Sequence, residues 1–432
     1  MPSTTATVGA LLHEDIAPGI ANQLNNETPA LDSFTTVKNA RIVGRNRVRG
    51  VRVNRNRGGY YTAEGGAPPV AGTPQIEEMR VPLRYYHHAM SFTKQVLDAS
   101  ETDKGAFEDV MRLGSEDIVD GIKRQRNQAL WGDGRGVRCL VNGTVTASGT
   151  IIADAPGGIA GADDGTRYLN VGDWVGFVTP AGALRVATAH RITAINSSTT
   201  FTITPTVTLV DNDLCVKCVE TAGALTIENT EYMHMPMGLN GMIDAGAWVN
   251  ILHGISRTTF PVMSSTVIGT TALPVGAVSA DLLQRACDAS RKVSGKNTDE
   301  IWLESGAKRA YLTIMEKDRR YTATDLQTPN AGTSAASARG ADTGLRFGKI
   351  PIMEDFDCPY GFIYGLNKQG ALRFPGPEGF LNDDGTTLHM SITAIDQWDA
   401  FYRHFENFTH EQPNTCWKLV GCTVDVVSAH VI

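Results

Sequence analysis

Cys215 and Cys218 stand three positions apart, and this C-x-x-C spacing is half of a common zinc site. No second cysteine pair and no histidine follows at ligand spacing. Because side chains alternate along a strand, two thiols at this spacing on a strand point to opposite faces. The seven cysteines of the chain are scattered over its length, which is typical of reduced thiols rather than of a disulfide framework. We therefore predict no metal at this pair.

Other residues that could do chemistry are the histidines and the acids. His87 and His88 are remote from the other histidines and do not form a metalloprotease spacing. Asp154, Asp163 and Asp164 occupy a glycine-rich stretch whose oxygens suit Ca²⁺, but their spacing is not that of an EF-hand. No nucleophile elbow, triad order or paired-carboxylate signature stands out. The sequence predicts no catalytic residue, no metal and no cofactor, although a site built from distant residues stays open.

The most unusual segment is a run of arginines alternating with valines. Val48, Val51 and Val53 lie between the arginines, and such alternation favours an extended strand. Neither face of this strand is apolar enough to belong to an ordinary core sheet. Seven guanidinium groups in 17 residues can bind phosphates or pair with carboxylates. The arginines stand at 41, 45, 47, 49, 52, 55 and 57.

The elements around this strand predict a long β-hairpin. A glycine- and proline-rich stretch from Gly58 to Pro74 forms the tip, and a second extended run from Met79 to Tyr86 returns. An isolated hairpin is marginally stable in water. We therefore expect this one to rest on another molecule.

A long helix is predicted from Asp103 to Trp131, because apolar residues keep a three-to-four spacing on one face. Acids precede bases along it, as the helix dipole favours, and Gly132 ends it. At 1.5 Å per residue it is about 40 Å long.

Short strands, rich in threonine and valine, replace the helical pattern from Val141 to about Thr230. They predict a compact all-β barrel or sandwich, with strands at 149–153, 173–179, 183–189, 200–204 and 214–219. From Met237 onward the pattern is mixed α/β. Helices are predicted at 279–293 and 305–317, and strands at 300–304, 350–353, 361–366, 387–393 and 401–405.

The totals bound the class of protein. A chain of 432 residues predicts two or three domains. The net charge of −7 argues against a general nucleic-acid-binding protein. No stretch approaches the roughly 18 apolar residues that a membrane span needs. The N-terminus lacks the features of a secretory signal.

The order of these elements resembles the major capsid proteins of tailed bacteriophages that share the Hong Kong 97 fold. Several local phrases are similar to that family, and it is their ordered set that carries the resemblance. They are residues 128–134 (QALWGDG), 238–243 (GLNGMI), 253–257 (HGISR), 294–303, 318–321 (DRRY) and 347–352 (FGKIPI).

The resemblance implies an α+β capsid fold with an inserted all-β domain. The expected parts are an N-terminal arm (1–40), an extended hairpin loop (41–86), a peripheral domain with a spine helix (87–140), the inserted all-β domain (141–235), an axial domain (236–380) and a return to peripheral and axial strands (381–432). The expected function is an icosahedral shell of hexamers and pentamers around double-stranded DNA. The expected location is the virion, after assembly in the host cytoplasm, with no membrane partner.

Two departures from the family matter. Some members join neighbouring subunits through a lysine on the hairpin, but this sequence has no lysine between Lys38 and Lys94. Others carry a scaffolding extension of about a hundred residues, whereas here some 40 residues precede the hairpin. We therefore expect no such crosslink and a separate scaffolding protein, together with a portal and, as an open option, a cement protein.

The hairpin is the predicted site of intersubunit contact. Its arginines would pair with acids on the spine helix of a neighbouring subunit, each exposed pair contributing about 0–1 kcal/mol. The arginines are Arg45, Arg47, Arg49, Arg52, Arg55 and Arg57, and the acids are Glu108, Asp109, Glu116 and Asp117. Contact with packaged DNA and a merely solvated ribbon stay open, although Tyr60 and Tyr61 are the only aromatic residues nearby to stack on bases.

Two other functions remain as alternatives to the phage shell. One is an encapsulin-like nanocompartment shell of the same fold. The other, from a different class, is a carbohydrate-active enzyme with a β accessory domain.

Overall fold

Two compact units make up the chain in the computed structural model. The structure describes residues 28–37, 46–68, 70–93, 110–158, 164–220, 224–317, 345–381, 389–390 and 397–423. The larger unit comprises 28–85, 126–376 and 405–432, and the smaller one comprises 1–27, 86–125 and 377–404. Among the described elements, those that continue from one unit into the other are α3 (Val110–Trp131), β4 (Arg84–Thr93), β19 (Ala371–Phe380) and β21 (Gln397–His410).

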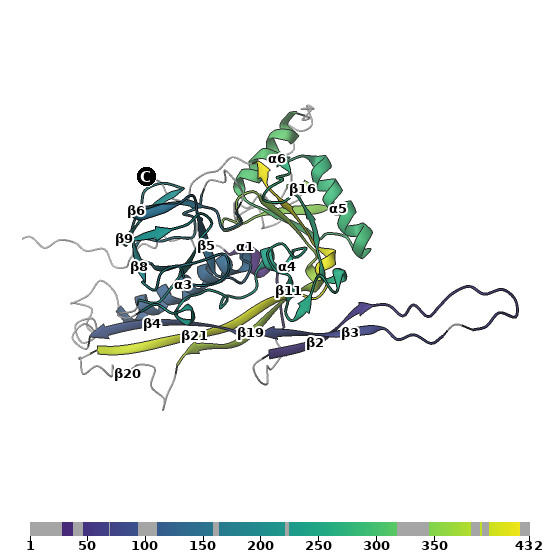
Figure 1. Ribbon diagram of the computed structural model, residues 1–432, viewed down its shortest axis with the longest axis horizontal. Coiled ribbons are helices and arrows are strands. Elements are labelled where there is room, and N and C mark those ends of the chain that lie inside the picture. Colours follow the sequence, from purple (N-terminus) through teal and green to yellow (C-terminus); the bar gives the residue numbers. More distant parts are fainter. Residues whose placement is uncertain are drawn as a thin grey trace, which may run out of the picture. The chain divides into compact units, whose positions relative to one another are not determined.

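A six-stranded mixed sheet with two helices lies in the larger unit (Figure 1). Its strand order is β13-β22-β18-β15-β17-β16, with β15 parallel to β17 and antiparallel to β18. The strands are β13 (Thr266–Ile268), β15 (Glu300–Leu303), β16 (Arg346–Phe347), β17 (Ile350–Glu354), β18 (Phe362–Leu366) and β22 (Trp417–Val420). The helices are α5 (Ala280–Ser294) and α6 (Ser305–Lys317), which share a buried core with the sheet.

The sequence predictions for this region are confirmed closely. Helix α5 begins after Ser279, whose side chain accepts a hydrogen bond from the backbone N–H of Leu282 at 3.1 Å. It ends at Gly295, which adopts the left-handed conformation with φ 74° that favours glycine. Helix α6 and strands β15, β17 and β18 lie within one residue of their predicted bounds.

A closed β-barrel precedes this sheet in the chain, in the strand order β10-β5-β6-β9-β8-β7. Its strands are β5 (Val137–Val141), β6 (Val145–Asp154), β7 (Trp174–Val178), β8 (His190–Ile195), β9 (Thr200–Leu209) and β10 (Leu214–Lys217). Alternate side chains fill the interior, with Phe177, Ile192 and Phe201 fully buried. The prediction of short strands after Val141 is thus confirmed, while the domain boundaries 141–235 stay a prediction.

One predicted strand of this region is wrong. Residues 183–189 form a single bridge, between Val178 and Leu184, and the strand begins only at His190. The backbone of the segment is used otherwise, because Arg185 donates to the carbonyl of Phe177 and Ala187 accepts from Leu225.

The main hydrophobic core of the larger unit surrounds the C-terminal end of α3. Trp131 lies edge-on to Trp302, with ring centroids 6.3 Å apart, and beside Tyr364 at 5.5 Å. The N-terminal segment joins this core through α1 (Pro29–Asp32) and β1 (Thr35–Thr36), which runs parallel to the start of β19. Short elements complete the unit: α4 (Leu239–Met242), β11 (Ile251–Leu252), β12 (Ile255–Ser256), β14 (Gly276–Ala277) and β23 (Cys422–Thr423).

The predicted hairpin is present. Strands β2 (Asn46–Asn54) and β3 (Gln75–Pro82) are antiparallel, with Arg49 opposite Met79 and Arg52 opposite Ile76. The two strands continue into a long loop that projects beyond the rest of the larger unit (Figure 1).

The smaller unit contains the first part of α3. Ile118 and Ile122 of this helix pack with Tyr402 of β21, and β20 (His389–Met390) pairs antiparallel with β21. The predicted helix is confirmed from Val110 to Trp131, and its predicted start at Asp103 lies outside the described residues. No helix among the described residues is long and apolar enough to cross a membrane.

Candidate functional site

The base of the β2–β3 hairpin is fixed to its own chain. Met79 and Val81 on β3 are buried, and so is Val53 on β2. The backbone N–H of Arg80 donates to the carbonyl of His253 at 2.8 Å, and Asn407 Nδ2 donates to the carbonyl of Pro82 at 2.6 Å. These contacts set the direction in which the hairpin leaves the larger unit.

Two of the predicted contact arginines have partners within the same chain. The Arg47 guanidinium lies 4.6 Å from the centroid of the Phe374 ring, a cation–π contact. Arg49 forms an ion pair with Glu411. The sequence could not reveal either pairing, because both partners lie more than 300 positions away in the chain.

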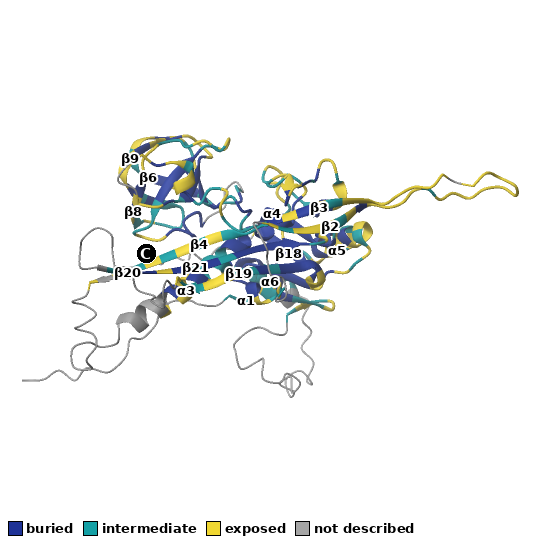
Figure 2. Cartoon of the chain, turned by 90° about the horizontal axis from the view of Figure 1, so that it is seen from below, coloured by how far each residue is buried: buried dark blue, intermediate teal, exposed yellow. Residues whose placement is uncertain are grey.

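The distal part of the hairpin is exposed to solvent. Every described residue from Arg55 to Pro74 is exposed except Gly58, and Figure 2 shows this tip in the colour of exposed residues. Asn56 joins the two sides of the tip, donating to the carbonyl of Gly72 at 2.7 Å and accepting from the N–H of Gly58 at 2.8 Å. Tyr61 and Val70 are almost fully exposed, so the tip presents apolar surface without a covering element.

Three more of the predicted arginines lie farther along the hairpin, one near the end of β2 and two on the distal part. Arg52, Arg55 and Arg57 are exposed, and no ion pair joins them to any residue that the structure describes. Arg45 lies outside the described residues. The structure therefore separates the arginines into an inner pair held by its own chain and an outer trio that faces solvent.

The acids predicted on the spine helix are only partly described. Glu116 is exposed on α3, in the smaller unit. Glu108, Asp109 and the side chain of Asp117 lie outside what the structure describes. The pairing of these acids with arginines of a neighbouring subunit stays a prediction.

A buried ionic cluster, which the sequence did not indicate, lies in the larger unit. Asp244 Oδ1 is 3.2 Å from Lys418 Nζ, and its Oδ2 is 3.5 Å from Arg257; all three side chains are fully buried. Burial alone would raise the pKa of Asp244, but Lys418 and backbone N–H groups hold it below its ordinary value. Burial lowers the pKa of Lys418 to about 8, although Asp244 attracts the proton.

This ionic cluster is structural, because its remaining polar atoms are satisfied by the chain itself. Arg257 donates to four backbone carbonyls, those of Met263, Val249, Gly241 and Met242. Lys418 donates to the backbone carbonyl and to the side-chain oxygen of Asn240 and lies 3.9 Å from the Trp248 ring. None of the three side chains is open to a substrate.

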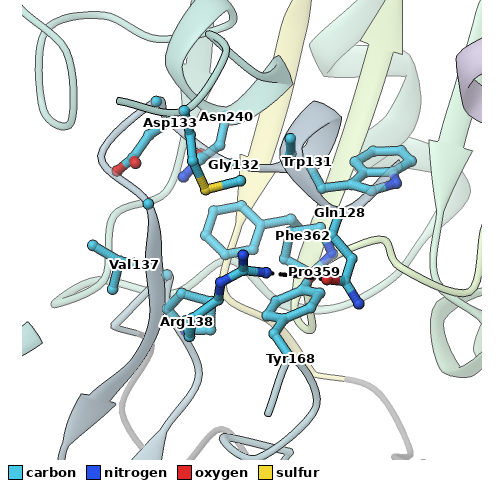
Figure 3. A pocket seen from close by; sticks show the side chains of 16 residues that line it. Gln128, Trp131, Gly132, Asp133, Val137, Arg138, Tyr168, Asn240, Pro359 and Phe362 are labelled. Carbon is cyan, nitrogen blue, oxygen red and sulfur yellow. Dashed lines mark hydrogen bonds between the residues drawn. The ribbon is translucent and has the colours of Figure 1, made fainter. Parts of the chain in front are cut away.

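A cavity of about 40 Å³ lies where the end of α3, the barrel and the segment before β18 meet (Figure 3). Arg138 and Gln128 face it and share a hydrogen bond of 3.1 Å, while Tyr168 and Phe362 close it. That volume holds one or two water molecules. Pockets for small-molecule substrates are of the order of 300–1,000 Å³, so this cavity is not such a site.

Gly157 fixes how closely the barrel loop approaches the sheet. A Cβ at this position would lie 2.3 Å from the Phe362 ring, and that ring is buried. We expect Gly157→Ala to lower the free energy of unfolding by about 1–3 kcal/mol, as overpacking of a core does. Urea titration measures this change. The control is Gly59→Ala, because a Cβ at Gly59 meets nothing within 4 Å; Gly143 is unsuitable as a control because its φ is positive. Equal stability of both variants would contradict the close approach.

The remaining sequence candidates do not assemble into a reactive centre. Among the described residues no group of three or more His, Cys, Asp or Glu could hold a metal. Cys215 and Cys218 are buried free thiols that belong to different apolar clusters. Asp164 lies 3.5 Å from Arg167, Asp154 accepts from Asn142 at 2.9 Å, and Asp163 lies outside the described residues.

One Cys–His contact appears only in the structure. Cys416 Sγ lies 3.3 Å from His410 Nε2, which is a spacing that nucleophilic cysteines use. Both side chains are fully buried, and the second ring nitrogen of His410 accepts from the N–H of Gln412 at 3.2 Å. The Nε2 atom also forms a hydrogen bond with the backbone carbonyl of Asn367 at 2.9 Å. Neither ring nitrogen is therefore left to take a proton from a substrate. We interpret the contact as structural.

Comparison with known proteins identifies the fold. No protein-family model matches the sequence, and no curated protein matches it. Solved structures do match over nearly the whole chain. The capsid of cyanophage A-1(L) has a TM-score of 0.55 at 14% identity, and the match covers 98% of this chain and 100% of that one.

Two further structures are similar at low identity. The capsid of the native GTA particle has a TM-score of 0.50 at 11% identity, covering 98% of this chain and 100% of that one. The holo-SrpI encapsulin complex from Synechococcus elongatus PCC 7942 has a TM-score of 0.46 at 10% identity, covering all of both chains. The α+β chain thus has the fold of phage capsid proteins, as the sequence resemblance predicts.

Proposed function

We propose that this chain is the major capsid protein of a tailed bacteriophage, a shell subunit rather than an enzyme. The observation that carries the proposal is the match to the cyanophage A-1(L) capsid over 98% of this chain and 100% of that one. The buried ionic cluster gives no support to the enzyme alternative, because Arg257 and Lys418 donate to carbonyls of the chain itself and are closed to a substrate.

In this proposal the Hong Kong 97 architecture assigns a role to each part. The segment up to residue 40 is the arm, β2 and β3 form the extended hairpin loop, and α3 is the spine helix of the peripheral domain. The mixed sheet with α5 and α6 belongs to the axial domain, and the barrel is the inserted all-β domain. Hexamers and pentamers enclose double-stranded DNA, with a separate scaffolding protein, a portal and, where one is used, a cement protein as partners.

The hairpin is the part that supports self-association most directly. A two-stranded ribbon is marginally stable alone, and this one carries exposed apolar side chains at its tip. We infer that the outer trio, Arg52, Arg55 and Arg57, together with Tyr61, lies on a neighbouring subunit. Because the hairpin contains no lysine, this contact is not a crosslink through a hairpin lysine.

Electron microscopy of the purified full chain tests the shell proposal. We expect closed particles from the protein expressed with its scaffolding protein, and nuclease-protected double-stranded DNA inside particles from infected cells. A monodisperse monomer under assembly conditions would count against any shell function. Closed particles that hold a protein cargo and no DNA would support the nanocompartment alternative instead.

A further inference from the structure

Two buried carboxylates lie close together between β17 and β18, in the larger unit. Asp355 and Asp357 are 1% and 6% exposed. The same side-chain amide nitrogen, Asn127 Nδ2 on α3, is 3.0 Å from Asp355 Oδ1 and 2.8 Å from Asp357 Oδ2. Asp355 Oδ1 and Asp357 Oδ2 therefore both accept a hydrogen bond from the same nitrogen, and the two carboxylates share that donor.

Asp355 connects three parts of the chain that are distant in sequence. Its Oδ1 accepts from Trp131 Nε1 at 3.2 Å and from the backbone N–H of Asp357 at 2.8 Å, besides Asn127. Its Oδ2 accepts from the backbone N–H of Ala30 in α1 at 3.2 Å. The carboxylate thus fixes the start of the described N-terminal segment to the end of α3.

The surroundings of Asp355 supply little compensating positive charge. On its own segment Asp355 faces Asp357 and the neutral thiol of Cys358. Helix α3 contributes the neutral side chains of Asn127 and Trp131. Helix α1 contributes the backbone N–H of Ala30, and its acid, Asp32, is exposed. Facing Cys358 beside the pair are Arg167 of the barrel and Glu304 after β15. Arg167 is itself 3.5 Å from Asp164, and Tyr168 donates its hydroxyl to the backbone carbonyl of Asp357 at 2.7 Å.

The electrostatics place the titration of Asp355 close to neutral pH. Burial, followed by repulsion from Asp357, raises its pKa from 3.8 to about 6, against the hydrogen bonds from Asp357, Asn127 and Ala30. The folded chain therefore takes up this proton as the pH falls from about 7 to about 5, well above the range in which an unfolded aspartate would.

We propose that Asp355 is a proton-operated latch on the N-terminal segment, which holds the Ala30 backbone while ionised and loosens it when protonated. The reason is reciprocity. A hydrogen bond from Ala30 favours the charged carboxylate, so protonation of the carboxylate must weaken that hydrogen bond by the same free energy. Oδ1 accepts three hydrogen bonds, whereas Oδ2 accepts from Ala30 at 3.2 Å and from Asn127 at 3.3 Å. The proton therefore adds at Oδ2, the less strongly bonded oxygen, where Ala30 donates.

The loosening is local and does not unfold the unit. Ala30, Leu31 and Phe34 are buried in the main core, and the Phe34 ring lies 5.6 Å from that of Phe408. Pairing of β1 with β19 also remains. Protonation therefore changes how often α1 opens, while the core stays packed.

Hydrogen–deuterium exchange of the purified full chain tests the latch. The measured quantity is the protection factor of a peptide that covers residues 28–37, corrected for the intrinsic dependence of exchange on pH. Between pH 7.5 and pH 5.0 we expect this factor to fall about tenfold, because a hydrogen bond to a charged acceptor is replaced by a weaker one. Peptides from the barrel should keep their protection.

Two variants separate the latch from a merely structural role. Asp355→Asn should have the low protection at every pH, because no carboxylate remains to titrate. Asp357→Asn keeps the backbone N–H and the contact with Asn127, but removes the repelling charge, so the midpoint of the loss should move to lower pH. Asp32→Asn, an exposed acid on the same helix, should leave the wild-type profile unchanged.

The proposal fails if the corrected protection of residues 28–37 is the same at pH 5.0 and pH 7.5 in the wild type. It also fails if Asp357→Asn leaves the midpoint where it was, or if Asp355→Asn titrates as the wild type does. Should Asp355→Asn not fold, the wild-type profile and the Asp357→Asn midpoint still decide.

Discussion

Replacing Asp244 with alanine is expected to lower the free energy of unfolding by about 3–5 kcal/mol, the usual cost of breaking a buried ion pair from one side. The substitution leaves Lys418 and Arg257 as two buried cations without a carboxylate. It also removes the acceptor for the backbone N–H groups of Gly246, Trp248 and Val249. Urea unfolding of the unassembled subunit measures the loss, and Asp288→Ala, at an exposed acid on α5, should change it by about 0.5 kcal/mol or less.

A double variant shows whether the charges act as a unit. In Asp244→Ala with Lys418→Met, one of the two unpaired cations is replaced by an apolar side chain of similar length. We expect the double variant to be more stable than the sum of the two single losses predicts, with a coupling of about 1–3 kcal/mol. A simple sum of the single losses would show that Asp244 and Lys418 contribute independently, which their separation of 3.2 Å does not lead us to expect.

This ionic cluster could not be predicted from the sequence, and neither could the strand that carries Lys418. Strand β22 was not predicted. A lysine within a strand of four residues favours an exposed position, whereas all four residues of β22, Lys418 included, are buried. The lysine is tolerated there because Asp244 and Asn240 lie against it, more than 170 positions away in the chain. A pattern within one segment carries no information about such a partner.

Local rules worked where the local chain decides the structure. Helix α5 closely matches its predicted range of 279–293, because Ser279 caps its start and Gly295 ends it, and both residues act within one turn of the helix. Strand β19 was missed for the opposite reason, since Pro375, Gly376 and Pro377 read as a loop. Neighbouring strands hold that segment extended, so tertiary pairing overrides its low strand propensity.

In the hairpin, local sequence decides one part of the structure and tertiary contacts decide another. Alternation of arginine and valine was enough to predict an extended strand, and the glycine-rich tip was enough to predict its return. Which arginines are free could not be predicted, because Glu411 and Phe374 reach the hairpin base only in the folded chain. Among the described arginines, Arg47 and Arg49 have partners in their own chain, and the intersubunit contact of the others stays a prediction.

Reversing the charge of that outer trio is expected to abolish shell assembly while leaving the subunit folded. In Arg52→Glu with Arg55→Glu and Arg57→Glu, three guanidinium groups that would pair with a neighbour's carboxylates become repelling charges. The three side chains have no described ion pair in their own chain, so the urea midpoint of the subunit should stay the same. We expect the yield of closed particles, measured by sedimentation and electron microscopy, to fall about tenfold or more.

Two matched variants make this result specific. Changing the same three positions to lysine keeps the charge but loses the bidentate geometry, so particle yield should fall less than with glutamate. Arg49→Glu places a negative charge beside Glu411, so it should lower the stability of the unassembled subunit, which the outer trio should not do. Normal particles from the triple glutamate variant would show that the tip is a solvated ribbon, and a loss of DNA retention with intact assembly would show that these arginines contact the packaged nucleic acid instead.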